Sequence, residues 1–141
     1  MSEEITRLVT DLIAAWNSHD VERIAQFYAE DYEGVDVAYS TPRRGRDDIR
    51  YTMSRYLTAF PDLHFSIKEL VVQGNKASLA WVGRGTHEGK VMNIPPSERP
   101  IELWGTSFFT VNNGQITYSL HIWDVAGLLR SIGLLPELNK V

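Results

Sequence analysis

Three polar side chains lie in two otherwise apolar segments near the C-terminal end, and they are the first candidates for chemistry. Ser107 lies within residues 100–111, and Ser119 and His121 lie within residues 115–123. An imidazole titrates near neutral pH, so His121 can take a proton from a carbon activated by a carbonyl group, while Ser107 orients the reacting oxygen. A neutral histidine that only hydrogen-bonds a ligand or a neighbouring group explains this residue equally well.

The turn between these two segments decides which side chains share a face. Asn112-Asn113-Gly114 fits a three-residue turn that ends in a left-handed glycine, so Val111 would pair with Gln115. Side chains alternate along a strand, and a two-residue turn would therefore reassign the faces. Apolar walls with a few convergent polar groups are typical of a ligand pocket. The face with this composition carries Leu103, Gly105, Ser107, Phe109, Ser119, His121 and Trp123.

The opposite face of the same hairpin is more uniformly apolar. It carries Trp104, Thr106, Phe108, Ile116, Tyr118, Leu120 and Ile122. An exposed apolar patch of this size is unusual on a monomer. We therefore predict a homodimer that forms through Trp104, Phe108, Tyr118, Leu120 and Ile122.

Asp124 and His87 are two further catalytic candidates, each with a simpler alternative. A carboxylate at a pocket rim can be tuned by burial, but Asp124 directly precedes apolar helical spacing and also suits a helix N-cap. His87 lies near a strand end, where it would reach the pocket mouth and orient the reacting oxygen, or else it is a surface histidine. Neither His87 nor His121 belongs to a spaced histidine pair or a carboxylate cluster, so we expect no metal ligands.

The elements that must position these groups follow from apolar spacing and turn residues. Helical spacing precedes long strand-like segments, which predicts an α+β fold with the helices on one face of the sheet. A curved antiparallel sheet wrapped around N-terminal helices leaves a cone-shaped internal pocket, and Trp16, Tyr32, Phe109 and Trp123 would be its walls unless they are simple core residues. The expected helices are 2–16, 21–28, 49–60 and 125–132, the expected strands are 31–37, 63–73, 76–88, 100–111 and 115–123, and residues 41–45 form a polar connection or a mobile lid.

Composition limits the classes of protein that fit. The 141 residues suit a single domain over 1–141, and a net charge of −4 makes nucleic acid and anionic membranes poor partners. Absence of cysteine excludes disulfides, thiolate zinc sites and a cysteine nucleophile. No signal-peptide pattern and no membrane-length apolar run is present, so we expect a cytoplasmic protein.

Several short motifs in a fixed order resemble a known family over nearly the whole chain. They are Ala15-Trp16-Asn17, Asp31-Tyr32, Phe60-Pro61-Asp62-Leu63, Arg84-Gly85-Thr86-His87-Glu88-Gly89, Ile94-Pro95-Pro96 and Trp123-Asp124-Val125-Ala126-Gly127-Leu128-Leu129-Arg130. Together they resemble a SnoaL-like polyketide cyclase, or ester cyclase, of the nuclear-transport-factor-two-like superfamily. The resemblance implies a cone-shaped α+β barrel.

The resemblance also implies a chemistry. Characterised members close a ring by a cofactor-free aldol reaction, with an acid/base aspartate on the last strand and an assisting histidine on the preceding strand. Here His121 stands at the position of that aspartate and Ser107 at the position of that histidine, while His87 matches a further family position. We therefore expect a cofactor-independent cyclase or isomerase acting on a hydrophobic, carbonyl-bearing small molecule. The alternatives are a non-catalytic small-molecule-binding module and a hydrolase that activates water.

Overall fold

One curved sheet organises the chain in the computed structural model, which describes residues 2–138. Its strand order is β2-β1-β6-β5-β4-β3. All neighbouring strands are antiparallel except β1 and β6, which pair in parallel. The strands are β1 (Tyr28–Asp36), β2 (Arg43–Arg44), β3 (His64–Gln73), β4 (Lys76–Thr86), β5 (Pro100–Asn112) and β6 (Gln115–Trp123).

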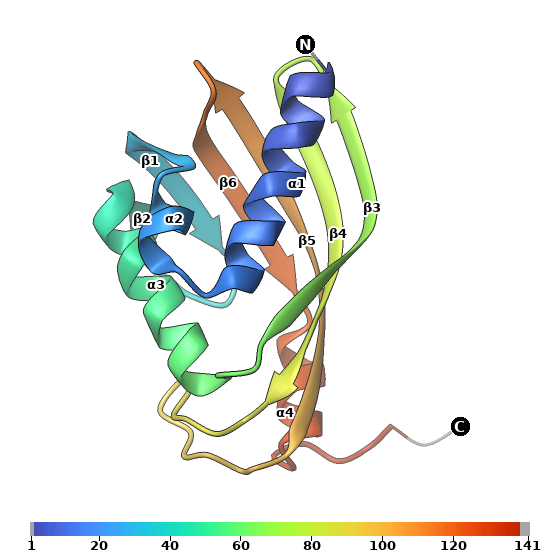
Figure 1. Cartoon of the computed structure of the whole chain (residues 1–141). Helices are drawn as coiled ribbons and strands as arrows, with labels where there is room; N and C mark the ends of the chain where they lie inside the picture. Colours follow the sequence, from blue (N-terminus) through green and yellow to red (C-terminus); the bar gives the residue numbers. More distant parts are fainter. Residues whose placement is uncertain (1, 139–141) are drawn as a thin grey trace.

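Helices flank this sheet and confirm the expected α+β fold. They are α1 (Ser2–Ser18), α2 (Val21–Ala25), α3 (Gly45–Ala59) and α4 (Val125–Ser131). Figure 1 shows α1, α2 and α3 in front of the concave side of the sheet, and α4 beside the lower end of β5. Helix α1 buries Ile5, Val9, Leu12 and Trp16, which recur every three or four residues and form one apolar stripe. None of the described helices is long and apolar enough to cross a membrane.

Tertiary pairing shortens the second predicted helix. Its helical spacing predicts an end at Tyr28, but α2 ends at Ala25 and Tyr28 already opens β1. The Tyr28 backbone lies beside Ile116 of β6, and its carbonyl oxygen accepts a hydrogen bond of 2.8 Å from Arg46 Nε. Strand pairing therefore overrides local helix propensity at this position.

The polar connection at residues 41–45 is also more ordered than the sequence indicates. Arg43 and Arg44 form β2, in which Arg44 pairs with Glu33 of β1. Helix α3 begins directly afterwards at Gly45, four residues before the predicted start at Ile49. Its first turn carries polar residues that give no apolar signal.

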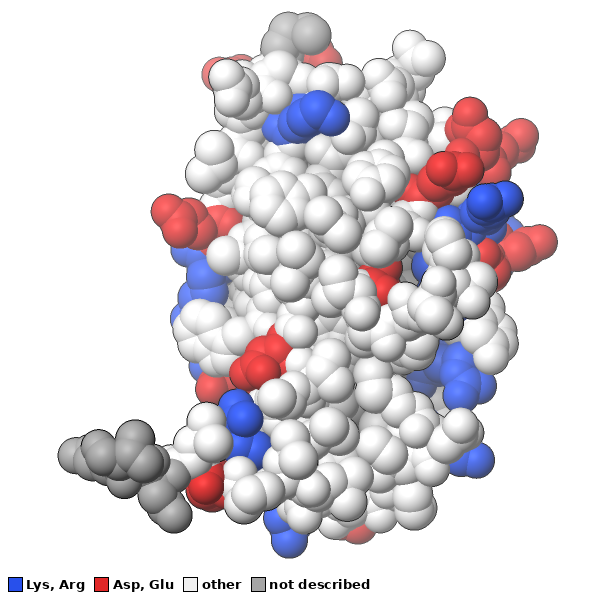
Figure 2. All heavy atoms as spheres, turned by 180° about the vertical axis from the view of Figure 1, so that it is seen from behind, with Lys and Arg blue, Asp and Glu red and all other residues white. Residues whose placement is uncertain are grey.

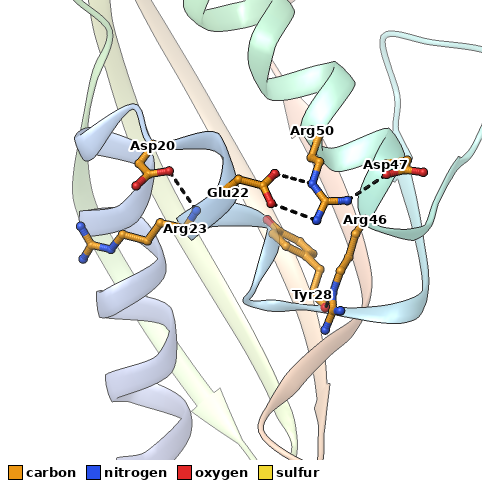
Figure 3. Close-up of polar contacts among 7 residues, drawn as sticks. All are labelled: Asp20, Glu22, Arg23, Tyr28, Arg46, Asp47 and Arg50. Atoms are coloured by element: carbon orange, nitrogen blue, oxygen red, sulfur yellow. Dashed lines mark hydrogen bonds and ion pairs between the residues drawn. The ribbon is translucent and has the colours of Figure 1, made fainter.

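Charged side chains join α2 to α3 at the edge of the sheet (Figure 3). Arg50 of α3 donates to Glu22 of α2, with 2.5 Å between Nε and Oε2, and to Asp47 at 2.8 Å. Asp20 caps α2 by accepting a hydrogen bond of 3.1 Å from the Arg23 amide. Exposed ion pairs each contribute about 0–1 kcal/mol, so this cluster adds little to the stability of the fold.

The predicted register of the last hairpin is wrong at its tip but right about the main faces. Asn112 pairs with Gln115, and the two-residue turn Asn113-Gly114 has positive φ at both residues. This geometry is typical of a type I′ turn. A bulge at Thr117 then restores the face relationship, so Ser107 pairs with His121 and Phe109 with Ser119.

The same bulge moves Ile116 to the other side of the sheet. The sequence predicts it on the outer face, but Ile116 is fully buried and pairs with Val111. The remaining outer aromatic residues are exposed: Trp104 by 51% and Phe108 by 41%. Figure 2, seen from behind, shows a broad uncharged surface with most of the charged side chains toward its margins.

Candidate functional site

A cavity of about 100 Å³ lies between the concave face of the sheet and helices α1 and α3. This volume holds several water molecules, and it is smaller than a pocket that buries a whole drug-sized ligand. Each of the strands β1 to β6 contributes at least one residue to the wall of the cavity. The lining residues are Trp16, Tyr28, Tyr32, Asp36, Arg43, Ile49, Thr52, Met53, Tyr56, Leu63, Phe65, Trp81, Leu103, His121 and Trp123.

A short hydrogen-bond chain fixes the imidazole of His121 in the wall. The Trp81 indole N–H donates to Ser107 Oγ at 3.0 Å, and Ser107 Oγ lies 2.6 Å from His121 Nδ1. Ser107 is fully buried, and no other acceptor for its hydroxyl proton is present among the described residues. Donation from Ser107 to Nδ1 satisfies all three groups and leaves the proton of the neutral imidazole on Nε2. Nε2–H is then the free donor of His121.

Burial keeps this imidazole neutral. Desolvation lowers the pKa of His121 to about 4, and the negative charge of Asp36 opposes part of that shift. The rings of Trp16 and Phe109 lie 6.5 Å and 6.0 Å from the imidazole ring. At neutral pH His121 is therefore a hydrogen-bond donor through Nε2–H.

Asp36 is a site residue that the sequence interpretation missed. Its Oδ1 accepts hydrogen bonds of 2.9 Å from the Trp123 indole and 2.9 Å from the Ala38 amide, and its Oδ2 lies 3.3 Å from the Tyr56 hydroxyl. Asp36 also pairs with His121 across β1 and β6, which turns both side chains toward the cavity. The alternation of side chains along a strand could have indicated it. Asp36 lies four residues after Tyr32, a predicted pocket wall, so the two side chains lie on the same face of β1.

Two tyrosines of β1 also line the cavity, as neutral phenols. Burial raises the pKa of Tyr32 to about 12 and raises the pKa of Tyr28 further. Their rings meet edge to face with centroids 4.9 Å apart. A side chain at Gly34 would overlap the Tyr32 hydroxyl, so the phenol can occupy this position only because residue 34 is glycine.

Some of the predicted site residues line the cavity, and others are buried outside its lining. Trp16, Tyr32, His121 and Trp123 line the cavity, as expected. Ser107, Phe109 and Ser119 are buried behind that lining, so Ser107 contacts His121 but does not reach the cavity.

His87 and Asp124 lie outside the cavity lining. His87 is fully buried, so it is not a surface histidine, and its Nδ1 accepts a hydrogen bond of 3.1 Å from the Ser97 amide. Asp124 caps α4 by accepting a bond of 2.8 Å from the Gly127 amide. Within residues 2–138, no group of three or more potential ligands has the geometry to hold a metal ion.

The buried histidine predicts a specific loss of stability in acid. The unfolded chain protonates His121 below about pH 6.5, whereas the folded chain keeps it neutral down to about pH 4. The stabilisation is therefore complete above pH 6.5, and on the order of 2 to 3 kcal/mol is lost as the pH falls to about 4. Urea unfolding of the wild type and His121→Gln at about pH 7 and about pH 4.5 measures it, with the larger loss expected for the wild type. Equal losses would contradict the assignment.

Comparisons with known proteins agree with this fold. The family profile described as "SnoaL-like polyketide cyclase" matches residues 6–132. No significant match was found among curated proteins.

Solved structures share the fold over almost the whole chain. AclR from Streptomyces galilaeus, a proposed hydroxylase, is 22% identical with a TM-score of 0.88, over 99% of this chain and 87% of AclR. TsrD from Streptomyces laurentii is 24% identical with a TM-score of 0.85, over 96% of this chain and 98% of TsrD. IdmH from Streptomyces antibioticus, a proposed polyketide cyclase, is 26% identical with a TM-score of 0.80, over 92% of this chain and 98% of IdmH.

Proposed function

Because the chain belongs to the SnoaL-like polyketide cyclase family, we propose that it is a cofactor-independent enzyme acting on a hydrophobic, carbonyl-bearing small molecule. The reaction class is proton transfer next to a carbonyl, which leads to isomerisation or to aldol ring closure. The apolar wall of the cavity supports a hydrophobic substrate.

The single observation that carries this proposal is the fixed orientation of His121. Ser107 holds Nδ1 at 2.6 Å, which leaves Nε2–H to donate to a ligand oxygen. A carbonyl oxygen that gains negative charge in the transition state is stabilised most by a donor that is already in place. His121 therefore serves as the acid that polarises the substrate carbonyl, and Ser107 serves as its positioning residue.

Asp36 supplies the matching base. Among the described lining residues it is the one carboxylate, and the only hydrogen bond to its Oδ2 from a described residue comes from the Tyr56 hydroxyl, at 3.3 Å. Asp36 takes the proton from the carbon next to the carbonyl, and the electron pair of the broken C–H bond moves toward the oxygen held by His121. Return of the proton to another carbon gives isomerisation, and attack of the enolate on a second carbonyl gives ring closure.

A non-catalytic binding module is the second candidate. The hydrogen bonds of Asp36 favour it, because the Trp123 indole and the Ala38 amide already donate to Oδ1. A carrier would use the same donor only to orient a bound carbonyl group, and the Asp36 carboxylate would remain a structural acceptor for Trp123 and Tyr56.

Hydrogen–deuterium exchange at carbon distinguishes the two candidates. We expect the protein to accelerate exchange of the α-protons of 2-tetralone in D2O, followed by proton NMR, with a rate that saturates as the ketone concentration rises. Saturable chemical-shift changes without accelerated exchange would contradict the enzymatic proposal and support the carrier.

The outer face of the sheet supports a homodimer. The outer patch consists of Trp104, Phe108, Tyr118, Leu120 and Ile122, of which Trp104, Phe108, Tyr118 and Ile122 are 39–51% exposed. Aromatic residues are enriched at protein interfaces, and an isologous dimer buries the same patch on both subunits. The uncharged surface in Figure 2 is consistent with close contact between two copies.

A further inference from the structure

A second hollow of about 260 Å³ adjoins the cavity, and both are lined by Arg43, Thr52 and Tyr56. We call it the vestibule. It lies between α3 and the loop that carries Lys90, and its other lining residues include Tyr39, Tyr51 and Arg55. Together the two hollows reach the lower end of the size range of small-molecule pockets, roughly 300 to 1,000 Å³.

The side chains that line the vestibule include three positively charged groups and no negatively charged one. Arg43, Arg55 and Lys90 line it, and no aspartate or glutamate does. Within residues 2–138, no carboxylate oxygen lies within 4.0 Å of a side-chain nitrogen of these three residues.

The two arginines that follow Arg43 most closely in the sequence do have carboxylate partners. Arg44 lies 4.0 Å from Glu33, and Arg46 lies 3.7 Å from Glu30. Both paired arginines are absent from the vestibule wall. The sequence run from Arg43 to Arg46 therefore divides into one cation that faces the ligand space and two that pair with β1.

Aromatic rings hold the two vestibule guanidinium groups in place. Arg43 Cζ lies 4.8 Å from the centre of the Tyr39 ring, and Arg55 Cζ lies 5.4 Å from the centre of the Tyr51 ring. Such stacking fixes the plane of a guanidinium group and leaves its edge N–H groups free to donate. The Nε of Arg43 is buried and has no acceptor among the described residues.

The one carboxylate of the adjoining cavity is already engaged elsewhere. Asp36 accepts from Trp123 and from the Ala38 amide, and it faces the hydroxyl of Tyr56. Tyr56 also contacts the Tyr39 hydroxyl at 3.2 Å, so a phenol lies between Asp36 and the Arg43–Tyr39 stack. The positive charge of the vestibule thus remains available for a ligand.

We propose that the vestibule binds a carboxylate of the same ligand whose apolar, carbonyl-bearing part occupies the cavity. This inference deepens the proposed function and rests on it. A carboxylate matches the planar donor edge of Arg43, and pairing with it satisfies the buried Nε. The substrate class becomes a hydrophobic keto acid, held by its acid group at the vestibule and by its ketone at His121.

The proposal is tested by comparing the affinities of two probes that have the same shape, one anionic and one neutral. The probes are 1-naphthylacetate and its neutral isostere 1-naphthylacetamide, measured by isothermal titration calorimetry. We expect the acetate to bind about 10-fold more tightly or better, because a hydrogen bond to a charged acceptor is stronger than one to a neutral acceptor. The preference should be lost in Arg43→Met and reduced in Arg55→Met, whose exposed site on α3 makes misfolding a poor explanation.

Arg44→Met is the matched control, because this neighbour has the same charge but pairs with Glu33. It should keep the full preference for the acetate. Equal binding of the two probes by the wild type, or an unchanged preference in both vestibule variants, would overturn the proposal. The ketone-exchange assay with 2-tetralone, which carries no acid group, reports on the proposed function separately and should be unaffected by Arg44→Met.

Discussion

Replacing His121 with phenylalanine is expected to slow the exchange of 2-tetralone α-protons by about 100-fold or more, the range for loss of a donor to a developing oxyanion. Phenylalanine keeps the aromatic packing against Trp16 and Phe109 but removes the Nε2–H donor. The same change at His64, an exposed residue of β3, is the matched control and should leave the rate unchanged. Proton NMR in D2O measures both rates.

Two further variants separate the roles within the site. Asp36→Asn removes the base while keeping an acceptor for Trp123, and we expect a loss similar to that of His121→Phe. Ser107→Ala removes the group that orients His121 and the acceptor of the Trp81 indole but keeps the Nε2–H donor, so the rate should fall by less than in His121→Phe. Exchange that survives intact in His121→Phe would contradict the assigned acid, whatever the result for Asp36.

Introducing a charge into the outer patch is expected to convert a dimer into a monomer. Phe108 is 41% exposed at the centre of β5, and Phe108→Glu would bury two carboxylates in an isologous contact. Loss of one aromatic anchor weakens an interface by about 2 kcal/mol or more, and the unpaired charges add to this. Sedimentation equilibrium at micromolar concentration measures the change.

Tyr51→Glu provides the comparison for that experiment. Tyr51 is an exposed aromatic residue too, by 55%, but it lies on α3 rather than on the outer face of the sheet. This variant should remain a dimer. A monomeric wild type would contradict the homodimer, and a dimeric Phe108→Glu would place the contact elsewhere.

The sequence predicted the layers and the faces because both follow from periodicity. The apolar stripe of α1 and the alternation along β5 and β6 recur in the structure, and they place Ser107 and His121 on one face. The predicted register at the tip of the hairpin was wrong, because the turn consists of Asn113-Gly114 alone. A bulge at Thr117 then shifts β6 by one residue and restores the predicted faces. A bulge depends on the partner strand, so the local sequence carries little signal for it.

The candidate site depended more strongly on tertiary contacts. Asp36 and His121 lie far apart in the sequence, and only the parallel pairing of β1 with β6 brings them to one wall. His87, in contrast, was a predicted site residue but lies outside the cavity lining. It is buried beside Phe60, and the two ring centres are 5.8 Å apart. Motif position alone could not distinguish these two histidines.

The orientation of His121 is the central element of the account, and nitrogen NMR of the imidazole tests it most directly. Long-range nitrogen–proton correlation spectra of the labelled protein should show the proton on Nε2 and Nδ1 as an acceptor. A titration should give a pKa of about 4. In Ser107→Ala the preference between the two tautomers should weaken, because the donor to Nδ1 is gone. A proton on Nδ1, or a pKa near the ordinary value of about 6.5, would contradict the assignment of His121 as a neutral, serine-oriented donor.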